Sequence, residues 1–280
     1  MTIIPSVSPP LPTRNRWARS LATNDPFKWL TRGWRDFTTQ AAISLVYGLI
    51  IFLISVAFVG LLFKSGRDYI LFPAFAGFMV VGPILAVGLY EKSRRIAEGL
   101  PLRWADIFFV KPRAGGQILF TGVLLCVLMM VWIRAAVLIY ALFFGLVPFP
   151  GLNNIAEMLF TTNVGWAMLL VGTAVGGLFA AFSFAISVFS MPMLLNEPVD
   201  ALTAMGSSMA LVWNNLRVLL IWAVIVLALF LASLATFMIG LIAIYPLLGH
   251  ATWHAYRAVR PEPGRTLRNG ADHELLRERR

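Results

Sequence analysis

Long apolar runs separated by short basic segments constrain the fold of this chain more than any other feature. The runs cover residues 41–63, 70–90, 117–146, 158–196 and 218–256, and Arg134 is the one Lys, Arg, Asp or Glu inside them. About 20 apolar residues cross a hydrocarbon core of roughly 30 Å. Charged residues make up only 13% of the chain, against roughly 25% in soluble domains. The pattern therefore predicts an all-α, polytopic membrane helical bundle and excludes an ordinary soluble enzyme.

The last apolar run decides the number of spans. Its 39 residues, 218–256, would form a helix about 58 Å long at 1.5 Å per residue. The run is therefore either two spans with a tight turn near Gly240 or one span that continues into the cytoplasm. Six Lys or Arg lie in 1–40, six in 91–116 and seven from Arg257 onward, and none lies in 147–163. Because basic segments stay cytoplasmic, both termini are predicted to be cytoplasmic and the number of spans even.

We therefore predict six transmembrane helices. Two spans in the fourth run would make the total odd, so we expect one long, tilted span there, from Val164 to about Ser190. The net charge of +10 then reflects the basic segments on the cytoplasmic side of the membrane, which set the orientation of the spans, and does not indicate nucleic-acid binding. The predicted domains are a disordered cytoplasmic tail over 1–24, a membrane domain over 25–259 and a charged cytoplasmic tail over 260–280.

A threefold internal repeat is a further hypothesis. Three short amphipathic stretches each follow a proline, at Pro26, Pro101 and Pro198, and a pair of spans follows each stretch. A proline also lies near the end of each pair, at positions 83, 192 and 246. Proline suits the first turn of a helix, and the stretches are typical of short cytoplasmic helices that lie in the membrane interface. The alternative is that every multi-pass protein alternates in this way without a repeat.

The first of these stretches shows the pattern most clearly. Its apolar residues fall at helical spacing, opposite a basic face. The apolar positions are Phe27, Leu30, Trp34 and Phe37, and the basic positions are Lys28, Arg32 and Arg35.

Three segments resemble a known family. They are GFMVVGPILAVGLYEKSRR at 77–95, GHATWHAYR at 249–257 and WADIF at 104–108. In combination they are similar to a bacterial family of uncharacterised integral membrane proteins, domain of unknown function 2189, and the likeness covers roughly 26–259. The resemblance implies a helical fold in the bacterial inner membrane. It implies no activity, so no catalytic or binding residue follows from it.

Arg134 is the sharpest single feature of the sequence. A charge inside a span costs from about 2.5 kcal/mol upward. Arg134 would serve as an anion contact or gate, or it would reach the outer face by snorkelling, with Glu157 as its nearest partner. Pro83 lies past the middle of its span, where it predicts a kink of the kind that lines transporter sites or of the kind that simply packs helices.

Two further groups bear on ligands. His250 and His254 share a helix face at spacing i, i+4, which suits a divalent metal, but the interpretation we favour is an aromatic and imidazole anchor at the membrane interface. A second group ends the second span: Tyr90, Glu91, Arg94 and Arg95. It predicts either charged helix-end anchors or a docking patch for anionic lipid head groups.

Small residues and missing motifs complete the functional hypothesis. Gly172, Gly176 and Ala180 form a small-residue face that favours close helix packing, within the chain, with another membrane protein or with a second copy. No catalytic motif is present, so we expect neither an enzyme nor a bound cofactor. The favoured function is a non-enzymatic accessory or scaffold protein of a membrane complex. The alternative is a small-solute or ion transporter or channel that uses Arg134 and the kink at Pro83.

Overall fold

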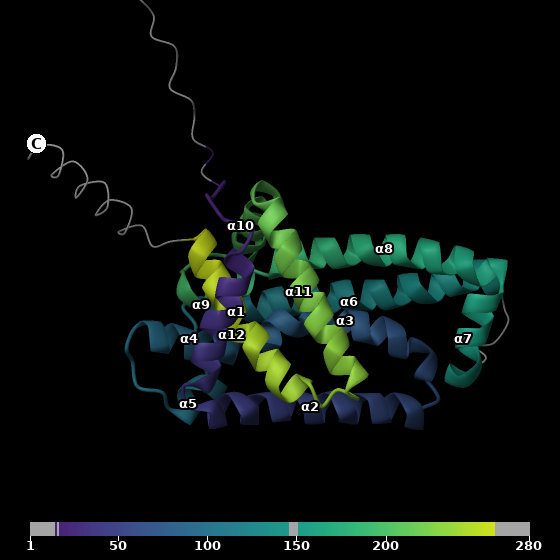
Figure 1. The fold of residues 1–280 in the computed structure, drawn as a ribbon, viewed down its shortest axis with the longest axis horizontal. Helices are drawn as coiled ribbons and strands as arrows, with labels where there is room; N and C mark the ends of the chain where they lie inside the picture. Colours follow the sequence, from purple (N-terminus) through teal and green to yellow (C-terminus); the bar gives the residue numbers. More distant parts are fainter. Residues whose placement is uncertain (1–14, 16, 146–150, 261–280) are drawn as a thin grey trace, which may run out of the picture.

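The computed structural model describes residue 15 and residues 17–145 and 151–260, and within that part of the chain the regular structure is helical. Figure 1 shows the helices in order. They are α1 (Asp25–Thr38), α2 (Ala41–Lys64), the 3-10 turn η1 (Asp68–Ile70), α3 (Leu71–Leu85), α4 (Val87–Ala97), α5 (Trp104–Phe108), α6 (Gly115–Phe144), α7 (Leu152–Thr161), α8 (Asn163–Ser187), α9 (Ser190–Asn196), α10 (Ala201–Asn214), α11 (Leu216–Ala235) and α12 (Leu241–Val259). The predicted terminal tails lie mostly outside the described residues.

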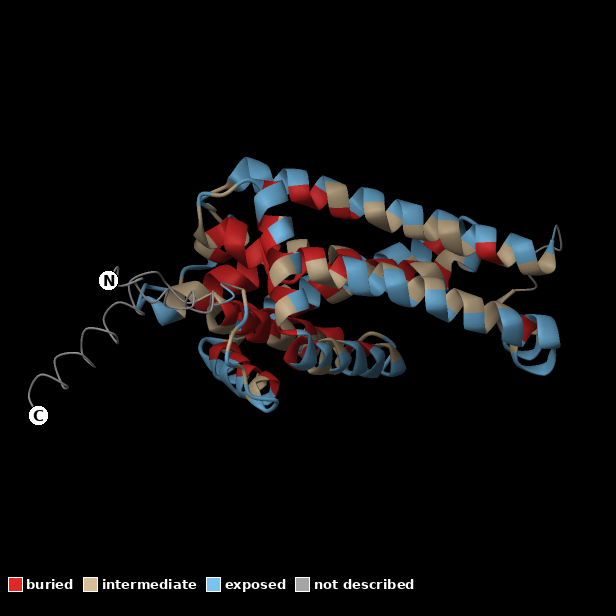
Figure 2. Cartoon of the chain, turned by 90° about the horizontal axis from the view of Figure 1, so that it is seen from above, coloured by how far each residue is buried: buried red, intermediate tan, exposed pale blue. Residues whose placement is uncertain are grey.

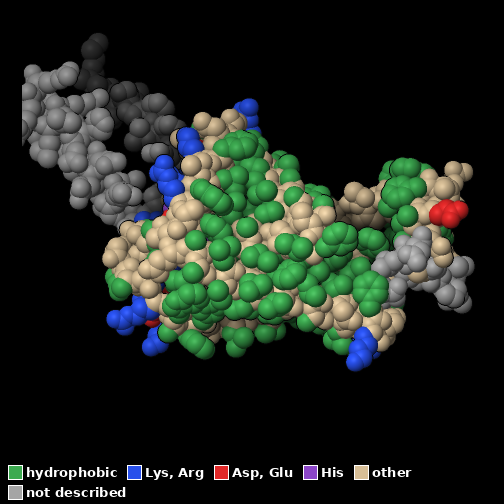
Figure 3. Space-filling view, turned by 60° about the horizontal axis from the view of Figure 1, so that its bottom comes forward, with side chains coloured by type: hydrophobic (Ala, Val, Ile, Leu, Met, Phe, Trp, Pro, Cys, Tyr) green, Lys and Arg blue, Asp and Glu red, His purple; other side chains and the backbone are tan. Residues whose placement is uncertain are grey.

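Five helical segments of the described chain are long and apolar enough to cross a membrane: Ala41–Lys64, Leu71–Ala97, Gly115–Phe144, Asn163–Asn196 and Leu216–Ala235. They coincide with the apolar runs because about 20 uncharged residues can satisfy their backbone only as a helix in hydrocarbon. Figure 3 shows the apolar side chains that cover the side of the bundle. The fold is thus the predicted all-α membrane bundle, while the sixth span stays a prediction, since α12 does not meet the same criterion.

The two ambiguous runs each take one of the conformations considered above. Residues 218–256 form two helices, α11 and α12, separated by a turn in which Phe237 and Met238 have positive φ angles of 52° and 66°. Residues 163–196 instead form one long path, in which α8 is followed directly by the short helix α9. The expectation of a single long span there agrees with this path.

The buried core lies at one end of the bundle, where α1, α4, α9 and α12 meet (Figures 1 and 2). Helix α12 is its centre, and α1 runs across it. The crossing is close because Gly33 of α1 has no side chain: a Cβ there would stand 2.7 Å from the backbone nitrogen of Ala251. Trp29 of α1 meets Trp222 of α11 edge-on in the same core, with ring centroids 5.8 Å apart.

The structure corrects one detail of the predicted short helices and adds another. Pro26 lies in the first turn of α1, but Pro101 and Pro198 each precede their helix by three residues, so only the first proline starts a helix. The face of α1 that the protein buries holds Trp29 and Gly33, while Phe27 and Trp34 of the predicted apolar stripe are exposed. Helix α1 therefore has two apolar faces.

The kink expected at Pro83 is a break between α3 and α4, and side chains from two other helices stabilise it. Proline removes a backbone donor, and the chain leaves the helical path at Ala86. The Tyr47 hydroxyl of α2 donates to the Leu85 carbonyl at 2.7 Å, and the Tyr245 hydroxyl of α12 donates to the Gly82 carbonyl at 2.8 Å. The break is thus built into the packing of the bundle.

These two tyrosines allow a matched prediction. The Gly82 carbonyl also accepts from the Ala86 backbone N–H, at 3.1 Å, whereas Tyr47 is the sole described donor to the Leu85 carbonyl. We expect Tyr47→Phe to lower the free energy of unfolding by about 1–3 kcal/mol, the cost of an unsatisfied buried group, and Tyr245→Phe to lower it by less. Thermal unfolding of both variants in detergent measures this, and an equal loss in the two would contradict it.

Candidate functional site: an apolar cavity and a buried polar cluster

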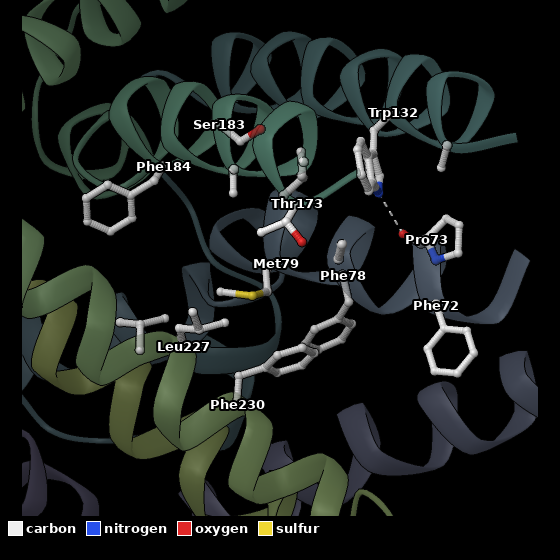
Figure 4. Close-up of a pocket in the computed structure, with 18 of the residues that line it drawn as sticks. Phe72, Pro73, Phe78, Met79, Trp132, Thr173, Ser183, Phe184, Leu227 and Phe230 are labelled. Atoms are coloured by element: carbon white, nitrogen blue, oxygen red, sulfur yellow. Dashed lines mark hydrogen bonds between the residues drawn. The ribbon is translucent and has the colours of Figure 1, made fainter. Parts of the chain in front are cut away.

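A cavity of about 980 Å³ lies between α3, α6, α8, α11 and α12. Figure 4 shows part of its wall, with Phe78 and Met79 of α3 facing Phe230 and Leu227 of α11, and Thr173 of α8 above them. None of the residues that line it is Lys, Arg, Asp, Glu or His in the part of the chain that the structure describes. The cavity is therefore an uncharged, almost wholly apolar chamber inside the membrane region.

The cavity lies where two long helices of the bundle diverge. Helix α12 packs along α2, and α3 packs along α6. Helices α8 and α11, in contrast, diverge and make no comparable contact in the described residues (Figure 1). Thr173 on α8 and Leu227 on α11 both line the cavity and are exposed. We call the gap between these two helices the α8–α11 seam.

Rigid aromatic contacts hold the cavity wall in place. The Phe78 and Phe230 rings stack with centroids 5.6 Å apart. The Trp132 indole N–H donates to the Pro73 carbonyl at 3.0 Å, the bond drawn in Figure 4. A Cβ at Gly176 would stand 2.9 Å from the Trp132 ring, whereas a Cβ at Gly172 would meet nothing within 4 Å. Glycine at 176 therefore allows α8 to approach α6, and glycine at 172 leaves space open.

A polar cluster lies buried at the other side of α12, among α1, α2 and α4. Lys92, Ser44, Ser93 and His250 are each 0% exposed. The Lys92 ammonium donates to the Ser44 hydroxyl at 2.7 Å and to the Gln40 carbonyl at 3.3 Å. The two nitrogens of His250 lie 3.0 Å from the Ser44 hydroxyl oxygen, at Nε2, and 2.8 Å from the Ser93 hydroxyl oxygen, at Nδ1. A continuous chain of hydrogen bonds thus links α2, α4 and α12.

The ammonium group fixes one direction in this chain. Because it only donates, Ser44 accepts from Lys92. Each ring nitrogen of His250 then has a hydroxyl partner that can either donate or accept, so either neutral tautomer forms both bonds. A protonated imidazole would bury a second positive charge beside Lys92.

The negative charge that balances Lys92 comes from α1. The Asp36 carboxylate is buried, accepts from His254 Nε2 at 2.9 Å, and interacts electrostatically with Lys92. His250 and His254 thus have separate partners on separate helices. Among the described residues, no group of three His, Cys, Asp or Glu could hold a metal ion.

Outside the cluster, the ends of α4 and α5 carry an ion network. The Arg94 guanidinium bonds both oxygens of Glu91 at 2.8 Å and also Glu98 at 2.8 Å. Arg95 lies 3.4 Å from Glu91 and 2.9 Å from Asp106. Tyr90, in contrast, lines the cavity. The residues predicted as one docking patch are therefore divided between the cavity and this network.

The remaining predicted site residues are spread over the bundle. Arg134 on α6 and Glu157 on α7 are both exposed, and no described ion pair joins them. Neither lines the cavity. Pro83 does line it, and so do Gly172, Gly176 and Ala180 of the small-residue face.

Sequence reasoning missed the residues that form the polar cluster around the two histidines. Lys92, Ser44 and Asp36 come from three helices, and 52 residues separate Lys92 from the Gln40 carbonyl it bonds. The available signal was a lysine two residues after an apolar run and an aspartate among the apolar positions of an amphipathic helix. Each of these is ordinary at a membrane interface.

A helical bundle with several long apolar helices and an uncharged cavity between them is the architecture of a multi-pass integral membrane protein. Residues 71–196 match a family described as predicted integral membrane protein (DUF2189). The resemblance expected from the sequence is thereby confirmed over that segment. Searches of curated proteins and of solved structures found no significant match.

Proposed function

We propose that this chain is a non-enzymatic membrane accessory protein that holds the apolar part of a lipid-like molecule in its cavity. The single observation that carries the proposal is the cavity of about 980 Å³ with an uncharged lining, open at the α8–α11 seam. Its volume lies at the upper end of the range of small-molecule sites, about 300–1,000 Å³. A water molecule needs two to four polar partners, so this lining suits hydrocarbon and not water.

An accessory role is supported by the charged side chains of α4 and by the polar cluster around Lys92, which form pairs and lie away from the cavity. The charged side chains of α4 pair with one another or with neighbouring elements, and hydrogen bonds link the members of the cluster around Lys92. Lys92, Ser44 and His250 do not line the cavity. A bound apolar molecule would therefore meet binding surfaces and not a nucleophile with its base.

Transport is the second candidate, and one observation favours it. Pro83 and the α3–α4 break lie at the cavity wall, where broken helices commonly line transporter sites. Because the lining carries no charge, the transported molecule would be apolar. Release of a bound apolar probe into acceptor vesicles only when the protein is present would favour transport over retention.

We also propose a bacterial inner-membrane location with six spans and both termini cytoplasmic. The separation of α11 from α12 supports the sixth span.

Helix contacts support a threefold repeat. Each repeat unit would consist of one short helix, α1, α5 or α10, and the pair of spans that follows it. Each short helix packs on the second span of the preceding unit in a closed ring: α1 on α12, α5 on α4, and α10 on α8 and α9. Exposed basic side chains gather at the end that holds α1 and α5 (Figure 3), which suits anionic lipid head groups. A C-terminal tag accessible only from outside the cell would contradict this topology.

The cavity proposal is tested by filling the chamber. Gly172→Phe places a ring in open space at the wall, whereas Leu170→Phe changes an exposed position two residues away on the same helix that does not line the cavity. Mass spectrometry of the purified proteins should detect a co-purified lipid-like molecule in the wild type and in Leu170→Phe, and lose it in Gly172→Phe. Equal retention in all three proteins would overturn the proposal.

A further inference from the structure

Two contacts align α3, α6 and α8 at one level of the bundle. The Trp132 indole of α6 donates to the Pro73 carbonyl in the first turn of α3. A Cβ at Gly176 of α8 would stand 2.9 Å from the Trp132 ring, so α6 and α8 are close at that point. Pro73 follows Asp68 by five residues. The shared level is therefore close to the turn between α2 and α3.

Charged side chains place the hydrocarbon boundary near the same level. Arg134 is exposed on α6, two residues beyond Trp132, and it follows Arg113, which precedes α6, by 21 residues. At 1.5 Å per residue these two charges are about 31 Å apart, close to the thickness of a hydrocarbon core, roughly 30 Å. Charges within that core are costly, so the two arginines mark the ends of the α6 span. Three charges at the turn between α2 and α3 agree with this boundary: Lys64, Arg67 and Asp68.

Helices α6 and α8 continue past this boundary, whereas α2 and α3 end near it (Figure 1). Residues 135–144 of α6 follow Arg134, and residues 163–175 of α8 precede Gly176. At 1.5 Å per residue, the α6 segment alone extends about 15 Å beyond the boundary. We call residues 135–144, α7 and residues 163–175 the α7 arm. In the proposed topology this arm lies on the outer side of the membrane.

The cavity continues into the α7 arm. Its lining includes Tyr140 of α6 and Ile155 and Leu159 of α7. Along α3 and α4 the lining extends from Tyr69 to Tyr90, a path of 21 residues, or about 31 Å at 1.5 Å per residue. The same uncharged chamber thus crosses the thickness of the hydrocarbon core and then extends past its boundary.

We infer that the α7 arm holds part of the hydrocarbon of a membrane lipid outside the bilayer. This rests on the proposed function, because it requires a lipid-like molecule in the cavity. A lipid chain enters at the α8–α11 seam, where Thr173 and Leu227 are exposed lining residues. The apolar lining of the arm then keeps the chain out of water beyond the boundary. A chain held in this way is partly withdrawn from the membrane, a state that delivery of a lipid to an acceptor on the arm's side requires.

The first test locates the arm. A Cys126→Ser background removes the one native thiol. Leu142→Cys then places a thiol on the arm, and Val123→Cys places one within the span, both at exposed positions of α6. In nanodiscs treated with a membrane-impermeant maleimide, we expect Leu142→Cys to react at least about tenfold faster, because a thiol in hydrocarbon forms little of the reactive thiolate. Equal rates for the two thiols would overturn the inference.

The second test locates the lipid chain. Wild-type protein is embedded in nanodiscs whose phosphatidylcholine carries a photoreactive diazirine at the middle or at the end of one acyl chain, and cross-linked residues are mapped by mass spectrometry after irradiation. We expect cross-links to Ile155 or Leu159 in the arm as well as to Phe78 in the membrane part of the cavity. Leu142 is exposed on the arm but does not line the cavity, so it should carry none.

Two variants of α7 show whether the lipid reaches the arm through the cavity. Ala156→Trp adds a ring to the lining in the arm, whereas Thr161→Trp adds the same ring at an exposed position that does not line the cavity. Cross-links to Leu159 should fall in the first variant and persist in the second, and equal cross-linking in both would overturn the inference. Cross-links to Phe78 without any in α7 of the wild type would overturn it and leave the proposed function standing. Cross-links to no lining residue would overturn both.

Discussion

Replacement of Lys92 by alanine is expected to lower the free energy of unfolding by about 3–5 kcal/mol. The substitution empties the volume of a long, fully buried side chain, a change that costs about 2–5 kcal/mol for apolar residues of similar length. It also leaves the Asp36 carboxylate buried without the positive charge with which it interacts. Heat or denaturant unfolding of the detergent-solubilised protein measures the loss.

A double-mutant cycle separates charge from volume in this prediction. Lys92→Met keeps the volume and removes the charge, and Asp36→Asn removes the opposite charge. If the two charges stabilise each other, the double variant should be more stable than the sum of the single losses implies, by about 0.5–3 kcal/mol. Lys28→Ala is the matched control, because the Lys28–Asp25 ion pair is at the surface, where such pairs contribute at most about 1 kcal/mol. Additive losses would show that the two charges do not stabilise each other.

The spans could be predicted from the sequence because hydrophobicity fixes them locally. A run such as 41–63 needs no knowledge of its neighbours to become α2, since any uncharged segment of that length satisfies its backbone only as a helix in hydrocarbon. The same reasoning separated α11 from α12 by length and charge. Reasoning from length and charge also predicted one long span within 163–196. It did not predict the break after α8 at Ser187, because no clear change in hydrophobicity marks that position.

The polar cluster could not be predicted in full, because it depends on which helix faces which. His250 was identified as a candidate by its spacing from His254, yet the residues that bond it are Ser44 and Ser93, which lie 206 and 157 positions away. Spacing along one helix predicts a shared face but not the partner across the gap. Asp36 was not singled out for the same reason.

The cavity likewise could not be predicted from the sequence. Pro83 and Gly172 were singled out for kinking and for close packing, and the structure places both at the cavity wall. Whether a small residue brings helices together or leaves a space between them depends on the opposite helix. Gly176 faces Trp132, whereas Gly172 faces nothing within 4 Å. Two glycines with the same sequence signal therefore have opposite structural roles.

Gly48→Leu is expected to separate α2 from α12 and to lower the free energy of unfolding by about 3 kcal/mol or more. A Cβ at this position would overlap the backbone carbonyl of Ile242 and would stand 2.9 Å from the Pro246 ring. Overpacking costs about 1–3 kcal/mol where side chains can move. Backbone atoms of a helix can move only by displacing the helix, so the cost should lie at or above the upper end of this range.

The same helix supplies the control for this prediction. Gly60 also lies in α2, and a Cβ there would meet nothing within 4 Å. Gly60→Leu makes the same chemical change, with the same effect on helix propensity, so it should leave the thermal midpoint unchanged or raise it. Because α12 carries His250, displacement of α12 by Gly48→Leu should also weaken the bond between Ser44 and His250, and the Lys92→Ala loss measured in the Gly48→Leu background should then be smaller than in the wild type. Equal midpoints for the two leucine variants would show that the contact between α2 and α12 is not close at Gly48.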